Sequence, residues 1–213
     1  MVSVDQLKDA VRKAQALESK LDPACFEIGG FTSPCIRHLM NNLGALSTRY
    51  LEIGVHRGAT FVSSLYKNLE IEQAVAIDNF SEFNESGDIK SSFLQSMETF
   101  KGTVPTWTLI DRDCWSDKTW SDLLVYLKNP VDLYLYDGAH DYESQYKAIA
   151  KFTSLLKKQF ILCVDDYDWK DVARGTEDAI KDLQLEIVTD IVCSGPDWHN
   201  GFAVFLLNKP LYR

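Results

Sequence analysis

The sequence has few basic residues for its length, and they do not gather into a basic cluster. Lysine and arginine number 22 among 213 residues, against 31 aspartates and glutamates, so the formal net charge is −9. Nucleic acids and anionic membranes are bound mainly through an excess of Lys and Arg. We therefore expect a small-molecule partner, with neither nucleic acid nor membrane as the main target.

Long apolar runs and cysteine motifs are also missing. No apolar run approaches the roughly 20 residues of a membrane-spanning helix, and the first residues read as a polar amphipathic helix, not a signal peptide. The five cysteines are scattered and contain no Cys-x-x-Cys. This usage is typical of reduced thiols in a cytoplasmic protein, not of a disulfide or zinc framework. The oligomeric state stays open, a homo-oligomer included.

A glycine turn, around which the rest of the chain is organised, lacks the middle glycine of dinucleotide-binding turns. An apolar run ends at Glu52, Gly54 and Gly58 bracket three residues, and a helical pattern follows. This predicts a buried parallel strand that turns into a helix at the edge where open α/β sheets bind nucleotides. Dinucleotide-binding turns need a middle glycine for close approach to the phosphates, but residues 55–56 fill that space. A carboxylate beside the turn suits a ligand with a cationic amino group.

The remaining chain alternates between strand and helix patterns. We predict a single α/β domain with a Rossmann-like, doubly wound, seven-stranded sheet and helices on both faces. Residues 1–45 would form an N-terminal helical segment packed on the core, and residues 46–213 the main domain. The turn signal Asn200-Gly201 before the last strand predicts a mostly parallel sheet with an antiparallel last strand. Further strands are expected at 74–78, 106–110, 131–136, 160–164, 185–192 and 202–207, with a turn at 156–159.

Acidic residues follow three of the predicted parallel strands. Asp78 ends the second strand, where a carboxylate accepts hydrogen bonds from a ribose diol; a plain turn aspartate is the alternative. Asp137 follows the fourth strand, and the pair Asp165 and Asp166 follows the fifth. Three carboxylates on adjacent strands repel one another, and a hard divalent cation, Mg²⁺ or Mn²⁺, would resolve that conflict. Helix-capping or turn aspartates are the alternative here.

These motifs together resemble a known family. The first glycine motif is similar to that of class I S-adenosylmethionine (SAM) methyltransferases. The run Asp-Gly-Ala-His-Asp-Tyr at residues 137–142, with the acidic pair at 165–166, resembles the metal-dependent O-methyltransferases of the macrocin and mycinamicin type, a group that includes cephalosporin hydroxylase-like proteins. The resemblance covers roughly residues 49–183.

The resemblance implies roles for individual residues. The metal would be bound by Asp137, Asp165 and Asp166, although Asp165 is shorter than the glutamate common in the family and would then act through water or orient the site. His140 would be the general base, or a helix-start residue bonded to a carboxylate. Asp111 is an alternative to Asp113 at the adenine. The cofactor-binding residues would be Glu52, Gly54, Gly58, Asp78, Asp113, the Cys114 backbone and Asp137.

The expected activity is methyl transfer from SAM to a hydroxyl group of a small metabolite, such as a sugar or polyketide-sugar conjugate. A cation would lower the pKa of the hydroxyl group, and His140 would accept its proton. Two alternatives are an NAD-type oxidoreductase and a SAM-binding or metal-binding module without activity.

Three segments have open roles. The glycine-rich turn at 29–34 would hold the SAM carboxylate or serve as a capped connection. The start of segment 79–101 and residues 197–200 are candidates for the substrate wall.

Overall fold

The computed structural model describes residues 1–83 and 88–210 and has the predicted α/β architecture. Its sheet has the strand order β3-β2-β1-β4-β5-β7-β6. The strands are β1 (Arg49–Ile53), β2 (Gln73–Asp78), β3 (Trp107–Asp111), β4 (Val131–Tyr136), β5 (Leu156–Asp165), β6 (Glu186–Cys193) and β7 (Phe202–Asn208). The helices are α1 (Val4–Gln15), α2 (Pro34–Gly44), α3 (Ala59–Leu65), α4 (Ile89–Phe100), α5 (Asp117–Tyr126), α6 (Tyr142–Phe152) and α7 (Lys170–Asp182), with short 3₁₀ turns η1 (Pro23–Glu27), η2 (Thr153–Leu155) and η3 (Pro196–Trp198).

Strand direction confirms the prediction of a mostly parallel sheet with an antiparallel last strand. Strands β1 to β5 pair in parallel, whereas β7 is antiparallel to both β5 and β6. Because β7 opposes both neighbours, β6 runs in the same direction as β5. The loop between β6 and β7 therefore lies at the carboxyl edge of the sheet, where the acidic residues after β4 and β5 also lie.

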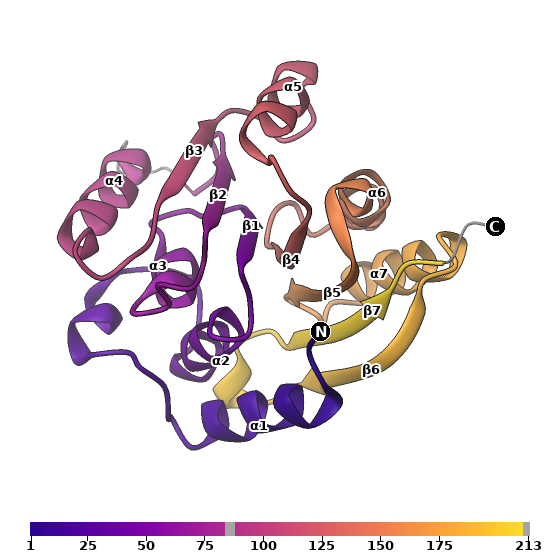
Figure 1. The fold of residues 1–213 in the computed structure, drawn as a ribbon, viewed down its shortest axis with the longest axis horizontal. Helices are drawn as coiled ribbons and strands as arrows, with labels where there is room; N and C mark the ends of the chain where they lie inside the picture. Colours follow the sequence, from indigo (N-terminus) through magenta and orange to yellow (C-terminus); the bar gives the residue numbers. More distant parts are fainter. Residues whose placement is uncertain (84–87, 211–213) are drawn as a thin grey trace.

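Helices cover both faces of the sheet, as Figure 1 shows. One core cluster joins α1, α2, α3 and α4 to residues such as Tyr50 and Leu133 on one face. The other joins α5, α6 and α7 to residues such as Leu51 and Tyr134 on the opposite face. The N-terminal helices share the core of the sheet, while the division of the chain at residue 45 stays a prediction.

Helix starts follow the sequence closely, and helix and strand ends less so. The amphipathic helix predicted at the start of the chain is α1, which begins with a capping box of Ser3 and Gln6 and ends at Gln15. The prediction of a turn at residues 156–159 was wrong, because β5 begins at Leu156. That extension is stabilised by pairing with β4 and β7, which are distant in sequence.

Two further features bear on the predictions. Of the segment that was expected to begin as a substrate wall, residues 84–87 lie outside the described residues, and α4 begins at Ile89. No helix in the described part of the chain is long and apolar enough to cross a membrane.

Candidate functional site

The first glycine of the turn sits where three strands meet. Gly54 has φ +89°, and a Cβ atom there would lie 1.8 Å from the backbone oxygen of Asp137. Its N–H donates to the carbonyl of Ile77 at 2.9 Å. Any larger residue would push the end of β1 away from the residues that follow β4, so glycine is required.

The second half of the turn is held by Asp78. Gly58, also at φ +89°, precedes α3, and a Cβ there would lie 3.1 Å from the Phe93 ring. The two oxygens of Asp78 accept from the backbone N–H groups of His56 at 2.8 Å and Phe80 at 2.7 Å. A carboxylate oxygen has a second acceptor position. Asp78 can therefore shape the turn and still accept from a ribose hydroxyl.

Glu52 lies deeper than a simple ligand contact would require. Its side chain is 0% exposed and accepts hydrogen bonds from the hydroxyl of Thr60 at 2.6 Å and from that of Tyr50. Burial raises its pKa to about 8, while the hydrogen bonds offset part of the increase. In this conformation Glu52 is enclosed by protein groups, and below a pH of about 8 its carboxyl group holds a proton.

A cluster of acidic groups and one imidazole forms beside this turn. His140 Nε2 lies 3.1 Å from Asp166 Oδ2 and 3.5 Å from Asp137 Oδ1. Desolvation, followed by the charges of Glu52 and Asp166, raises the pKa of Asp137 well above its ordinary value. The conflict between carboxylates expected from the strand order is therefore present in the structure.

The ligand atoms that converge here differ from the predicted set. Single ligand atoms of Asp137, His140 and Asp166 all lie within 4.8 Å of one another. Asp165 is only 3% exposed and contributes no ligand atom to this group. The backbone of Asp166 has φ +52°, the left-handed region, so this residue departs from the strand direction of Asp165. The role of Asp165, as a metal ligand through water or as an orienting residue, stays a prediction.

Unpartnered polar atoms mark the same cluster as a place for a cation. Among the described residues, His140 Nε2, Asp165 Oδ1 and Asp166 Oδ1 are buried and make no hydrogen bond. Buried polar atoms normally have partners, and those that lack them point to a ligand or ion. The two carboxylates are ligands that suit Mg²⁺ or Mn²⁺, whereas the imidazole is a ligand more typical of transition metals.

The candidate adenine end is more open. Asp113 is exposed and accepts the N–H of Trp115 at 2.9 Å, whereas Asp111 forms an ion pair with Lys90 at 2.5 Å. Burial raises the pKa of the Cys114 thiol to about 12. Asp113 thus keeps an oxygen for a ligand, while Asp111 is occupied by a cation.

Other expectations need correction or addition. Trp198 is only 5% exposed and packs in the core, so it is not a substrate-wall residue. Tyr142 of the resemblance motif donates to Asp178 at 2.9 Å and points to α7. Sequence reasoning missed Trp169, whose ring meets that of His140 edge-on at 5.2 Å. Its position, just after the acidic pair, was the available signal.

Solved structures share this fold at low sequence identity. The O-methyltransferase TomG from Streptomyces achromogenes, solved with SAM, is 17% identical over 97% of this chain and 91% of its own, with TM-score 0.55. The methyltransferase PaMTH1 from Podospora anserina, bound to S-adenosylhomocysteine (SAH), is 11% identical over 97% of this chain and 89% of its own, with TM-score 0.57. The tRNA methyltransferase TrmK from B. subtilis is 10% identical over 86% of this chain and 68% of its own, with TM-score 0.53. At these identities the likeness shows the fold alone.

Comparison of sequences is more specific about the family than the comparison of structures. No match was found among curated proteins. A family model described as a methyltransferase domain matches residues 51–167, more than half of the chain, from the first glycine motif through the acidic pair. The prediction of an enzyme of this class is confirmed, while the narrower macrocin-type grouping is not. The protein therefore belongs to the methyltransferase domain family and has the class I sheet topology.

Proposed function

We propose that this protein transfers a methyl group from SAM to a hydroxyl group of a small metabolite, with help from a divalent cation. The observation that carries the proposal is the convergence of Asp137, His140 and Asp166 beside the glycine turn. A carboxylate cluster next to a cofactor turn offers both a cation site and a proton acceptor.

The residues at the turn fit SAM. Gly54 and Gly58 let the turn pack closely against Asp137 and Phe93, and Asp78 keeps free acceptor positions for a ribose. The raised pKa values of Glu52 and Asp137 would fall beside the ammonium and sulfonium groups of SAM, because a nearby positive charge favours the ionised carboxylate. SAM supplies an activated methyl group with its own leaving group, so the protein has only to orient the acceptor and remove its proton.

The residues of the acidic cluster divide into holding and proton-transfer roles. Asp137 and Asp166 would hold the cation, and the buried Asp165 beside them would orient the site. A bound Mg²⁺ or Mn²⁺ would lower the pKa of a coordinated hydroxyl group. His140 then accepts the proton, and the edge of Trp169 restricts how its imidazole turns.

A second role for His140 follows from the same geometry. Its Nε2 belongs to the set of ligand atoms within 4.8 Å, so it would serve as a third metal ligand. The two roles differ in a measurable way. Loss of metal affinity in His140→Ala indicates a ligand, whereas unchanged affinity with lost turnover indicates the base.

The acceptor is proposed on chemical grounds. A net charge of −9 disfavours a polyanion such as RNA, even though a tRNA methyltransferase shares the fold. Small hydroxylated metabolites, including sugars and polyketide-sugar conjugates, fit the proposal. Methyl transfer to tRNA would contradict it.

The first experiment is calorimetric titration of metal-stripped protein with SAM and with NAD, each repeated after adding Mg²⁺. Binding of SAM with no NAD signal supports the proposal, and SAH release in an acceptor screen then identifies substrates. Binding of NAD instead would revive the oxidoreductase alternative. SAM binding without SAH formation from any acceptor would favour a non-catalytic module.

A further inference from the structure

A second group of unpartnered polar atoms lies in the glycine turn and in the segment that contacts it. Among the described residues, Arg57 Nε, Thr32 Oγ1 and both ring nitrogens of His56 are buried and make no hydrogen bond. None of these atoms belongs to the carboxylate cluster. Buried donors without partners are costly, so this group points to a ligand of its own.

Two consecutive glycines bring the segment at residues 28–33 against the turn. A Cβ on Gly29 would lie 3.1 Å from Arg57 Nη1, and one on Gly30 would lie 3.0 Å from the Cβ of Ala59. Phe31 follows, and its ring meets that of His56 at 5.4 Å. The absence of side chains at 29 and 30 lets the backbone cover the Arg57 guanidinium closely.

This region carries positive charge without an acidic partner. Arg57 makes no ion pair or hydrogen bond to another described residue. Arg37 is 6% exposed and donates only to the carbonyl oxygens of Cys25 at 3.1 Å and Ile28 at 2.8 Å. Buried charges are normally paired. Both arginines lie against the two glycines, since a Cβ on Gly29 would lie 3.1 Å from Arg57 Nη1 and one on Gly30 would lie 3.9 Å from Arg37 Nη2. Two positive charges therefore lie close together in a chain with a net charge of −9.

We propose that Arg57, assisted by the Thr32 hydroxyl, binds the α-carboxylate at the methionine end of SAM. This inference rests on the proposed function. The acidic cluster around Asp137 suits the cationic groups of SAM but repels its carboxylate. Arg57 stands in the turn itself, two residues after Val55 and just before Gly58, and a guanidinium binds a carboxylate through paired hydrogen bonds. The turn thus offers opposite charges to the two ends of a zwitterion.

The test compares ligands with and without that carboxylate by calorimetry. Wild-type protein, Arg57→Gln, Arg57→Lys and Thr32→Val are each titrated with SAH, SAM and decarboxylated SAM. Arg49→Gln is the matched control, because Arg49 pairs with Glu72 at the opposite edge of the sheet. Circular dichroism and thermal melting show that each variant is folded before titration.

We expect Arg57→Gln to weaken SAM and SAH by about 10- to 100-fold, the range for a charge-assisted hydrogen bond, and to leave decarboxylated SAM unchanged. Arg57→Lys should recover part of the loss, Thr32→Val should lose less, and Arg49→Gln should match wild type. Equal losses for ligands with and without the carboxylate, or none, would overturn the inference while SAM binding stands. Wild-type protein that binds neither SAM nor SAH would instead overturn the proposed function, and this inference with it.

Discussion

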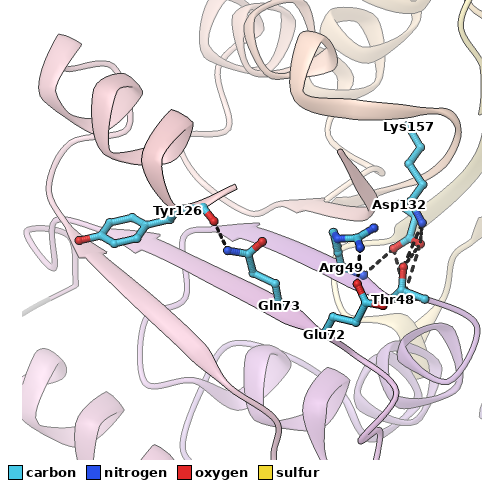
Figure 2. Close-up of polar contacts among 7 residues, drawn as sticks. All are labelled: Thr48, Arg49, Glu72, Gln73, Tyr126, Asp132 and Lys157. Carbon is cyan, nitrogen blue, oxygen red and sulfur yellow. Dashed lines mark hydrogen bonds and ion pairs between the residues drawn. The ribbon is translucent and has the colours of Figure 1, made fainter. Parts of the chain in front are cut away.

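Aspartates at the two edges of the sheet have different partners. At the amino edge, Asp132 accepts hydrogen bonds from the backbone N–H groups of Thr48 and Arg49 and lies 2.6 Å from Lys157 Nζ (Figure 2). At the carboxyl edge, Asp137 faces other carboxylates, with His140 as its neighbour at 3.5 Å. The same residue type is therefore structural where the chain supplies its partners and functional where it does not.

The difference has an electrostatic cost. Desolvation, followed by the charges of neighbouring carboxylates, raises the pKa of both Asp137 and Asp165 well above the ordinary value. Neither group has a Lys or Arg partner among the described residues that would offset this increase. Such perturbed groups concentrate at functional sites. The amino edge instead pairs Arg49 with Glu72, so its carboxylates have cations beside them and need no ligand.

The comparison is tested most strongly at Asp166. We expect Asp166→Ala to lower metal-dependent turnover by about 1,000-fold or more, because the cation that activates the acceptor loses a ligand. SAM affinity should survive. Measurements of SAH release against Mg²⁺ concentration and of SAM affinity check this, with Asp182→Ala at the end of α7 as the control. Equal loss of turnover and SAM affinity would show that the two sites are not separate.

Stability against pH probes the buried Glu52. Its pKa is about 8 in the folded protein, against an ordinary value of 4.5, so between these values the folded state holds a proton that the unfolded state has released. Stability must then fall as pH rises through this window, by about 3 kcal/mol from pH 5 to 7.5. Urea unfolding of Glu52→Gln should show a flatter profile. Glu72→Gln, at the amino edge, should keep the wild-type slope; identical slopes in all three proteins would contradict the assignment.

The amino edge should respond in stability and not in chemistry. Asp132→Ala leaves two backbone N–H groups without their acceptor and the Lys157 ammonium without its carboxylate, although Lys157 still donates to the Thr48 hydroxyl. We therefore expect a loss of about 2 kcal/mol in the free energy of unfolding. Asp132→Asn should lose less because it keeps one acceptor oxygen. Turnover per folded molecule should match wild type. A fall in turnover without a change in stability would place Asp132 in the active site.

The smallest expected effect is the loss of SAM affinity when Asp78, the predicted partner of the ribose, is replaced. Asp78→Ala should weaken SAM binding by about 10-fold, or about 1.4 kcal/mol, through lost acceptor positions. Because Asp78 also accepts from His56 and Phe80, the variant's melting temperature is measured alongside its affinity for SAM. An unchanged dissociation constant would remove Asp78 from the cofactor site.

Much of the architecture was predictable from local pattern. The apolar runs placed β4 correctly to the residue, and the Asn200-Gly201 turn predicted the antiparallel β7. The acidic residues after β4 and β5 were expected to meet, because the carboxyl ends of neighbouring parallel strands share an edge. Local spacing is sufficient for such features, since strand periodicity and turn chemistry involve only nearby residues.

Tertiary structure decided which side chains face the site. The left-handed backbone at Asp166 selects it over Asp165 as the partner of His140. The packing of α3 hides Glu52, and the loop before β7 buries Trp198. The unpartnered donors of Arg57 arise because residues 28–33, far away in sequence, cover it. The orientation and burial of these side chains depend on contacts between segments that are distant in sequence. The periodicity of the sequence does not show those contacts.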